Sequence, residues 1–285
     1  MNNKIIAYQG VQGAYSHLAC QNIFPQSETI ACESFTDAMK LVESKKASFA
    51  VIPLENSTAG RVEEIYRLIP KLSLYIIDEH YEPVNHCLLG VKGATKQDIQ
   101  YVSSHPQALA QCHENITSLG YKALAKFDTA GSAKEVSESN NKKYGAIASK
   151  LAASLYDLEI LNESFEDLNG NVTRFIVLSH EIHIPVPIKN EEYIISLVFQ
   201  VRDIPAALYK ALGGFATNSV NIIKLESYAT PGSMAVSLFH IDIEAYPNET
   251  RYKLALEELE FFAKHVRCLG VYKKFSNVSA DQLVS

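Results

Sequence analysis

The sequence predicts an α/β protein made of a two-lobed module with parallel or mixed sheets and a smaller α+β unit of ferredoxin-like plan. Strand-like apolar runs alternate with helical patterns through the first two-thirds of the 285 residues, which is typical of parallel α/β sheets. A polar break containing Pro185 and Pro187 then separates this part from a short β-α-β-β-α-β pattern. A chain of this length has room for more than one domain.

The expected elements of the first module are short apolar runs with helical patterns between several of them. Strands are expected at Lys4–Tyr8, Ser48–Pro53, Leu74–Asp78, Asn85–Gly90, Gln100–Ser103, Lys122–Lys126, Gly145–Ala148 and Arg174–Leu178. Helices are expected at residues 15–24, 35–45, 61–70, 106–119, 130–139 and 149–156. The polar segment Glu79–Val84 is interpreted as a crossover between two lobes, with the chain returning before Arg174. This pattern predicts a periplasmic-binding-protein-like module whose cleft lies between the lobes.

The second unit is expected to alternate four strands with two helices. The strands are Tyr193–Val201, Asn221–Tyr228, Met234–Ile243 and Val266–Tyr272, and the helices are Pro205–Ala216 and Glu249–Ala263. Pro205 suits a first helical position because proline lacks the N–H that this position leaves unused. We therefore divide the chain into a first module at 1–178, a linker at 179–192, a second domain at 193–275 and a flexible polar tail at 276–285.

Composition and charge exclude several functional classes. A net charge of -6 argues against nucleic acid or an anionic membrane as partner, because both are bound through basic surface. No apolar run approaches the roughly 18 residues of a membrane span, and no signal-peptide pattern follows Met1, so we expect a cytoplasmic protein. The five cysteines are scattered without a Cys-x-x-Cys pair, which predicts reduced thiols and no metal site.

Three loops of the first module share one construction, in which a strand ends, small or polar residues turn the chain and a helix begins. They are Gln9–Ser16, Pro53–Arg61 and Ser103–Gln107. Such loops direct backbone N–H groups to a crevice beyond the carboxyl ends of the strands, where anionic ligands bind. Each loop also has a purely structural interpretation, with Gly10 and Gly13 as turn residues and ordinary helix caps in the other two.

The pentad Asn171-Val172-Thr173-Arg174-Phe175 carries the strongest chemical signal. A hydroxyl beside a permanent cation suits an anionic substrate that must lose oxygen. On a strand, Thr173 and Phe175 would share one face and Arg174 would point away. Thr173 and Arg174 would therefore serve one pocket only where the strand frays into a loop. The alternative is a buried strand end whose arginine reaches solvent.

Three segments in this order, residues 53–60, 104–112 and 171–175, resemble prephenate dehydratase, and the ferredoxin-like unit resembles the ACT regulatory domain of that family. The resemblance covers about residues 4–275. It implies a carbon–oxygen lyase of phenylalanine biosynthesis that converts prephenate to phenylpyruvate with loss of carbon dioxide and water. No cofactor or metal is implied, because aromatisation drives the reaction. No chorismate mutase segment precedes the first strand, so we expect a monofunctional enzyme.

The resemblance also implies roles for particular residues. Thr173 is expected to donate toward the leaving hydroxyl, and Arg174 to clamp the pyruvyl carboxylate. Glu55 is expected to position other groups, because an ionised carboxylate facing a dianion would repel it. Catalytic or orienting roles are also expected for Asn56 and Gln111. The expected substrate-binding residues are Ser104, Ser57, Thr58, Gly13, Tyr15 and Phe175, the last two forming an apolar wall or simply packing in the core.

The second unit departs from the family pattern where L-phenylalanine is bound at a dimer interface. The expected effector contacts are Ala207, Leu208, Asn221, Glu226 and Ser227. Ala206 stands where the family usually has glycine, and Tyr228-Ala229 stands where Arg-Pro is usual. Losing the arginine removes a charge and a fork of donors. We therefore expect a homodimer or homotetramer in which the response to L-phenylalanine is weakened or altered.

Two other functions remain open at this point. Arogenate, which carries an amino group in place of the keto group, is an alternative substrate that the motifs do not distinguish from prephenate. A two-lobed module with an ACT domain would also suit a small-molecule sensor without catalysis. Retention of Thr173 beside Arg174 favours the enzyme.

Overall fold

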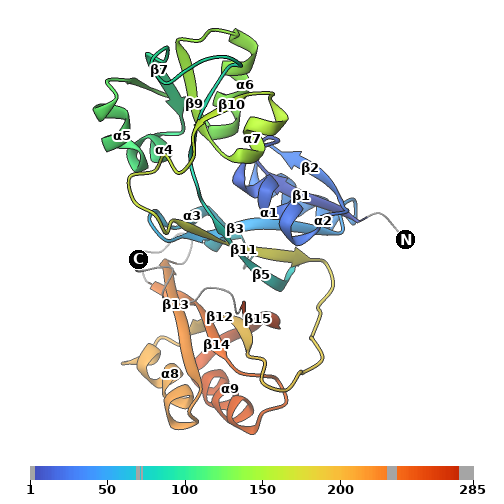
Figure 1. Ribbon diagram of the computed structural model, residues 1–285. Helices are drawn as coiled ribbons and strands as arrows, with labels where there is room; N and C mark the ends of the chain where they lie inside the picture. The colour runs from blue at the N-terminus through green and yellow to red at the C-terminus, as the bar shows by residue number, and fades with distance from the viewer. Residues whose placement is uncertain (1–3, 69–70, 72, 230–235, 276–285) are drawn as a thin grey trace. The chain divides into compact units, whose positions relative to one another are not determined.

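The computed structural model describes residues 4–68, 71, 73–229 and 236–275, which form two compact units (Figure 1). The N-terminal unit contains residues 4–65 and 80–175, and the C-terminal unit contains the described residues of 66–79 and 176–275. Segment 66–79 was expected in the first module, so the observed division differs there. The boundary also falls at Phe175 and not at residue 178. The tail expected at 276–285 and the start of the strand expected at Met234 lie outside the described residues.

The helices and strands follow the alternation expected from the sequence. In the first half of the chain they are β1 (Ile5–Gln9), α1 (Tyr15–Ile23), β2 (Glu28–Cys32), α2 (Phe35–Glu43), β3 (Phe49–Asn56), β4 (Gly60–Arg61), α3 (Glu63–Leu68), β5 (Tyr75–Pro83), β6 (Cys87–Gly90), β7 (Tyr101–Ser104), α4 (Pro106–Gln111), α5 (His113–Ser118), β8 (Lys122–Ala125) and α6 (Thr129–Ser139). In the second half they are β9 (Tyr144–Ala148), α7 (Lys150–Leu155), β10 (Glu159–Asn162), β11 (Val172–Ser179), β12 (Tyr193–Val201), α8 (Ala207–Thr217), β13 (Asn221–Ala229), β14 (Val236–Glu244), α9 (Thr250–Phe262) and β15 (Ala263–Lys273).

The first lobe of the N-terminal unit is built on strands in the order β11-β3-β1-β2. β1 pairs in parallel with both β2 and β3. Helix α2 begins at a cap in which Ser34 accepts a hydrogen bond from the backbone N–H of Asp37. Its buried residues Ala38, Met39 and Val42 recur at helical spacing and cover the sheet. The carboxyl end of β3 is therefore held in a packed layer.

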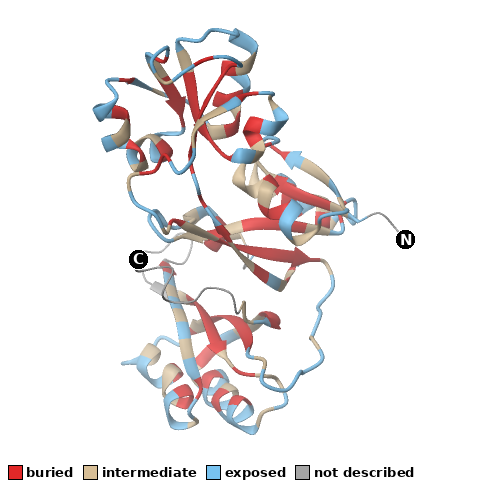
Figure 2. Ribbon diagram, in the orientation of Figure 1, coloured by how far each residue is buried: buried red, intermediate tan, exposed pale blue. Residues whose placement is uncertain are grey.

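The second lobe is a five-stranded sheet in the order β10-β6-β9-β7-β8. β7 is parallel to β8 and β9, whereas β6 is antiparallel to β9 and β10, so the sheet is mixed as expected. Alternate residues of the strands enter two different cores. Leu89 and Ala146 pack with α6 and α7, while Leu88 and Ile147 pack with α4 and α5. Figure 2 shows the strands buried between helices whose outer faces are exposed.

The C-terminal unit has the expected β-α-β-β-α-β plan, with strands ordered β13-β14-β12-β15. Helices α8 and α9 cover one face, where Leu197 and Phe199 of β12 meet Ile241 and Phe215. Residue Ile76 of β5 also pairs with Gly270 of β15. The order of the elements and of the strands confirms the ferredoxin-like arrangement predicted for the second unit.

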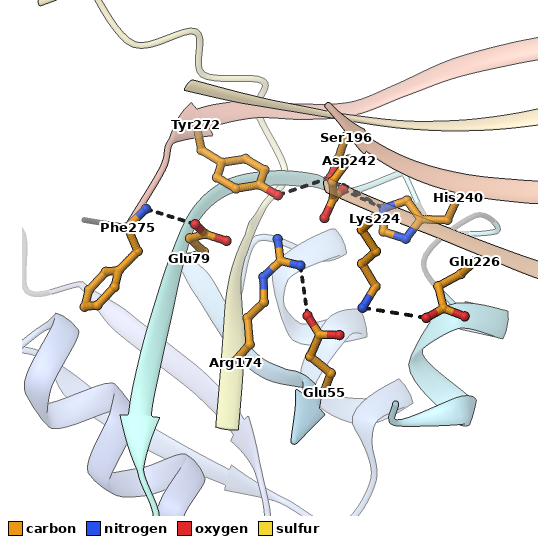
Figure 3. A network of polar contacts seen from close by, with 10 residues as sticks. All are labelled: Glu55, Glu79, Arg174, Ser196, Lys224, Glu226, His240, Asp242, Tyr272 and Phe275. Atoms are coloured by element: carbon orange, nitrogen blue, oxygen red, sulfur yellow. Dashed lines mark hydrogen bonds and ion pairs between the residues drawn. The ribbon is translucent and has the colours of Figure 1, made fainter. Parts of the chain in front are cut away.

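The opposite face of this C-terminal sheet carries a buried polar cluster made of Ser196, His240, Asp242 and Tyr272 (Figure 3). Ser196 donates its hydroxyl to Asp242, and the carboxylate of Asp242 lies 3.1 Å from Nε2 of His240. The hydroxyl oxygens of Ser196 and Tyr272 are 3.2 Å apart. These contacts satisfy polar groups that would be costly to bury alone.

Three local features differ from the sequence-based expectation. Strands β2, β4 and β10 were not predicted: β2 and β10 are short and partly exposed and so lack a continuous apolar run, and β4 has only two residues, the second of which was expected to begin a helix. The helix predicted over 106–119 is two helices that break at Cys112, whose φ of -118° is not helical. The polar segment Glu79–Val84, which was predicted as a crossover, lies almost entirely in β5. Its side chains Glu79 and Glu82 are buried.

Candidate active site

A cavity of about 380 Å³ lies in the N-terminal unit, and residues from both of its lobes line it. The lining residues are Tyr15, Pro53, Asn56, Ala59, Gly60, Arg61, Val62, Val84, His86, His105, Gln107, Ala108, Gln111, Asp128, Thr129, Asn171 and Thr173. Four residues predicted for the site are among them: Asn56, Thr173, Gln111 and Tyr15. They come from the end of β3, the start of β11, the end of α4 and the start of α1.

Asn56 occupies the last position of β3, where the chain turns into β4. Its Oδ1 accepts hydrogen bonds from the backbone N–H groups of Thr58 and Ala59, at 3.0 and 2.9 Å. Its Nδ2 donates to Thr173 Oγ1 at 2.9 Å and to Asn171 Oδ1 at 2.7 Å. The side chain therefore closes its own turn and joins β3 to the start of β11, which holds the Thr173 hydroxyl at the cavity wall.

Gln111 and His86 continue this polar wall. Gln111 donates from Nε2 to Thr58 Oγ1 at 2.7 Å and accepts at Oε1 from Asn171 at 3.1 Å. The same Oε1 lies 2.8 Å from Nε2 of His86, which is only 2% exposed. Burial lowers the pKa of His86, an effect that the Gln111 hydrogen bond and the Glu166 carboxylate oppose.

Tyr15 contributes its hydroxyl to this wall. The hydroxyl donates to the backbone carbonyl of Asn85 at 2.7 Å and lies 3.1 Å from Nδ1 of His86. Burial raises the pKa of Tyr15 well above its ordinary value, so the hydroxyl keeps its proton. Tyr15 was predicted as part of an apolar wall, and the structure adds this polar contact.

Arg174 and Glu55 do not line the cavity, so the direct carboxylate clamp predicted for Arg174 has no support in this geometry. Arg174 is 4% exposed, and its Nη1 lies 3.1 Å from Oε1 of Glu55 (Figure 3). β11 remains a regular strand through Arg174, and strand alternation turns this side chain away from the face that carries Thr173. Glu55 acts as the partner of a buried cation.

Five of the six predicted substrate-binding residues also lie outside the cavity lining. Ser104 is fully buried and donates to the carbonyl of Ile147 at 2.6 Å, and Phe175 is 1% exposed in the core. Gly13 has a φ of 89° and packs against Ala152, while its carbonyl accepts from Ser149. Ser57 accepts a hydrogen bond from Val172 N, and Thr58 takes part through its bonds to Gln111 and Asn56. None of these five residues is part of the cavity lining, and Thr58 is bonded directly to two residues that are, Gln111 and Asn56.

Sequence reasoning missed several lining residues, notably His86, Asn171, Arg61 and Asp128. Asn171 stands in the pentad that drew attention to the site, but its strand-entry position carried no signal of its own. His86 lies at the start of β6, far in sequence from the other groups. Arg61 lines the cavity as a cation and also pairs with Glu63 at 2.7 Å. Only the fold brings these residues together.

The arrangement suits recognition of an anion through neutral donors supplemented by one lining arginine, Arg61. Among the residues that the structure describes, no group of three or more His, Cys, Asp or Glu side chains could hold a metal ion. In the described part of the chain, no helix is both long and apolar enough to cross a lipid bilayer.

The predicted effector residues lie at the start of α8 and along β13. Ala207 and Leu208 pack against the core of the C-terminal unit, and Asn221 donates to Glu244 at 2.6 Å. Glu226 lies 3.8 Å from Lys224, and Ser227 is exposed on the same strand. β13 stands at the end of the C-terminal strand order.

Comparison with known proteins decides the family. A family model described as prephenate dehydratase matches residues 6–183. The chain belongs to the prephenate dehydratase family. This confirms the prediction made from the three motifs, and the match covers the cavity residues and both lobes of the N-terminal unit.

Several relatives share most of the chain. A protein of Komagataeibacter europaeus named bifunctional N-acyl-homoserine lactone acylase/prephenate dehydratase is 43% identical over 94% of this chain and 95% of its own length. A protein of Arabidopsis thaliana named arogenate dehydratase/prephenate dehydratase 1, chloroplastic, is 42% identical over 94% of this chain and 71% of its own length.

Solved structures agree on the fold. GqqA, described as a novel type of quorum-quenching acylase, is 42% identical and superimposes with a TM-score of 0.89 over 95% of this chain and 98% of its own. Prephenate dehydratase from Arthrobacter aurescens, solved in complex with L-Phe, is 27% identical with a TM-score of 0.86 over 95% of this chain and 90% of its own. The two-lobed α/β arrangement is therefore that of the family.

Proposed function

We propose that this chain catalyses the decarboxylative dehydration of prephenate to phenylpyruvate. The observation that carries the proposal is the hydrogen-bonded group of Thr173, Asn56 and Gln111 on one cavity wall, in a chain of this family. The cavity volume of about 380 Å³ suits a ligand of this size.

The reaction needs one proton and redistributes one pair of bonding electrons into the ring. The bond from the ring to its carboxylate breaks and releases carbon dioxide, and its electrons complete the aromatic ring as the C–O bond breaks. The departing hydroxyl takes up a proton and leaves as water. Thr173 is the donor to this oxygen, and because its hydroxyl is a weak acid, it stabilises the transition state mainly by hydrogen bonding.

Arg61 and the Gln111 amide are the groups best placed to hold the remaining carboxylate. Both line the cavity, and Arg61 is exposed while Gln111 is partly exposed. Arg174 then contributes indirectly by pairing with Glu55 beneath the wall. Arg61 is the only lysine or arginine among the described residues that line the cavity, so with Arg61 on the remaining carboxylate the departing one has no second cation of this kind, which favours its loss as neutral carbon dioxide.

The direct test is prephenate turnover by the purified chain without added metal or cofactor, followed through the absorbance of phenylpyruvate in alkali. Thr173→Val keeps the shape of the side chain and removes its donor, so kcat should fall by roughly 100-fold or more. Thr173→Ser is the matched control, because it keeps the hydroxyl, and it should retain most of the activity. Equal turnover by Thr173→Val and the unmodified chain would exclude the donor role.

Arogenate is the second candidate substrate, favoured by the relatives named arogenate dehydratase/prephenate dehydratase. The two substrates differ only at the side-chain keto or amino group. Parallel assays with both substrates, compared by kcat/KM, distinguish them. A chain that binds one of them in calorimetry but turns over neither would instead be a sensor.

N-acyl-homoserine lactone hydrolysis is a further candidate, favoured by the 43% identity to the relative that carries acylase in its name. The neighbouring hydroxyls of Ser103 and Ser104 both donate to buried backbone carbonyls, so neither is presented as a nucleophile. Chromatographic measurement of released homoserine lactone tests this activity. Persistence of that release in Thr173→Val would assign it to other residues.

We further propose that the C-terminal unit is an ACT-type regulatory domain with a weakened or altered response to L-phenylalanine, and that the chain is a cytoplasmic homodimer or homotetramer. The relative from Arthrobacter aurescens solved with L-Phe supports an effector of this class. Tyr228 and Ala206 are the residues that depart from the family pattern. Isothermal calorimetry measures the binding of L-phenylalanine, and tight saturable binding would contradict a weakened site. Sedimentation measures the oligomeric state.

A further inference from the structure

The direction of the hydrogen bonds around the cavity is set by the backbone. A backbone N–H can only donate, and Thr58 and Ala59 both donate to the same side-chain atom, Asn56 Oδ1. The orientation of the Asn56 amide is therefore determined, and its Nδ2 must be the atom that faces Thr173 and Asn171.

This orientation propagates through the neighbouring amides. Because Asn56 Nδ2 donates to Asn171 Oδ1 at 2.7 Å, Asn171 must present its Nδ2 to Gln111 Oε1, 3.1 Å away. Gln111 then presents its own Nε2 to Thr58 Oγ1 at 2.7 Å, and Thr58 returns its proton to Asn56 Oδ1 at 2.8 Å. Each donor meets an acceptor, so reversing any one amide would break a bond at its neighbour.

The first consequence concerns Thr173. Its Oγ1 accepts a hydrogen bond from Asn56 at 2.9 Å, so the hydroxyl need not donate to that side chain. Thr173 lines the cavity, so its hydroxyl proton is available to a group bound there. Gln111 also lines the cavity, and its Nε2 carries a second N–H besides the one donated to Thr58.

The second consequence concerns His86, at the far end of the network. Gln111 Oε1 is an acceptor, so the Nε2 of His86 that lies 2.8 Å from it must carry a proton. In the neutral ring Nδ1 of His86 is then an acceptor, so the Tyr15 hydroxyl, 3.1 Å from Nδ1 and 2.7 Å from the Asn85 carbonyl, shares its one proton between the two. The backbone N–H of His86 donates to the buried Glu166 carboxylate at 2.8 Å, which fixes the position of the residue.

We propose that the Thr58–Ala59 turn polarises one hydrogen-bond relay, through Asn56, Asn171 and Gln111 to His86, so that the wall presents donors to the cavity. Asn171 and His86 are positioning residues of this relay, and His86 is protonated at Nε2. The link to catalysis rests on the proposed dehydratase function, whereas the direction of the relay does not.

The direction is tested by ¹⁵N NMR of the histidine-labelled chain above pH 7, with the His86 signals assigned by their loss in His86→Gln. We expect Nε2 of His86 to be protonated in the absence of any substrate. A neutral ring protonated on Nδ1 alone would overturn the relay. This measurement needs no turnover, so it decides the relay even if prephenate is not the substrate.

Asn56→Asp reverses the relay without changing the shape of the residue. The carboxylate introduced there still accepts from the two backbone N–H groups, but its second oxygen would draw the Thr173 proton away from the cavity and turn the Asn171 and Gln111 amides. We expect the His86 proton to move to Nδ1 and kcat for prephenate to fall roughly 100-fold or more. Thermal unfolding verifies that the variant is folded.

The matched control for the added charge is Gln107→Glu, because Gln107 lines the same cavity outside the relay. It should raise KM by repelling the dianion while the His86 tautomer stays as in the unmodified chain. An Asn56→Asp chain that keeps the Nε2–H tautomer would overturn the relay. A kcat loss in Asn56→Asp no larger than that in Gln107→Glu would overturn its role in catalysis.

Discussion

At the scale of single residues, Asn56 and Arg174 have different roles, although both stand in the motifs that predicted the site. Asn56 uses one atom to close a turn and another to hold Thr173, which only a carboxamide of this length can do at that place. Arg174 follows the catalytic candidate in sequence but is buried against Glu55. The pentad 171–175 therefore combines Thr173, which lines the cavity, with Arg174, which supports the strand.

Replacing Arg174 should affect stability more than substrate binding. Arg174→Met keeps much of the side-chain volume and removes the ion pair with the partly buried Glu55, which should cost on the order of 2 kcal/mol of unfolding free energy. Urea unfolding measures this loss, and KM for prephenate should change less than about 3-fold. A KM that rises by orders of magnitude with unchanged stability would restore the direct clamp.

At the scale of elements, the start of α8 carries a backbone conformation that suits glycine better than the residue present. Ala206 precedes the helix with a φ of 56°, in the left-handed region where a Cβ is unfavourable. The family pattern has glycine here, so the structure gives a physical meaning to the departure noted in the sequence. The substitution stores strain at the loop expected to contact an effector.

Ala206→Gly should relieve this strain. The unfolding free energy should rise by about 0.5–1 kcal/mol, because the gain at positive φ exceeds the entropy cost of glycine in the unfolded chain. Denaturant titration measures the change. Ala207→Gly, one position later inside α8, is the control and should destabilise by a similar amount. Loss of stability in Ala206→Gly would show that the left-handed conformation carries no strain.

The pairing of β15 with β5 depends on a close backbone approach. Gly270 pairs with Ile76, and a Cβ at Gly270 would overlap the Ile76 carbonyl. Gly270→Ala should therefore separate the two strands and cost about 2 kcal/mol or more. Gly213→Ala provides the contrast, since a Cβ there meets nothing within 4 Å on α8, and it should stabilise by about 0.5–1 kcal/mol. Calorimetric measurement of Tm for Gly270→Ala and Gly213→Ala tests these two opposite expectations.

At the scale of the whole molecule, both units bury weakly acidic groups that the fold keeps protonated. Burial raises the pKa of Cys20 in the N-terminal unit and of Tyr252 in the C-terminal unit, each to about 12. Burial also raises the pKa values of Tyr8, Cys87 and Cys112. The folded chain therefore holds protons that the unfolded chain releases in alkali.

Stability should fall as pH rises above about 9. The pKa of each group is raised by folding, so its contribution is complete below the unfolded value, near 9.0 for a thiol, and is lost as pH rises toward the folded value of about 12. In urea unfolding at pH 7, 9 and 10, the free energy of unfolding should decrease only between pH 9 and pH 10. Cys20→Ala should make this alkaline slope shallower, and an unchanged slope would exclude Cys20 as a contributor.

The sequence by itself determined the alternation of strands and helices in the first module, the ferredoxin-like second unit and the family. These follow from local periodicity, turn residues and short motifs, which depend on neighbours in the chain. It also predicted four residues that line the cavity: Thr173 from a hydroxyl beside a cation, and Asn56, Gln111 and Tyr15 with the help of the family resemblance. The sequence did not predict strands β2 and β10, because both are short and partly exposed and neither has a continuous apolar run.

Only the tertiary structure decided which of the candidates face the cavity and how their hydrogen bonds run. Arg174 and Phe175 lie in the same pentad as Thr173, yet neither lines the cavity: Arg174 points to the other face of β11, and Phe175 is buried in the core further along the strand. His86 and Thr173 line the same cavity although they are far apart in the sequence. No local pattern encodes this proximity. The physical reason is that side-chain direction depends on a strand's register within its sheet, and that hydrogen-bond direction depends on which backbone groups fold against which side chains.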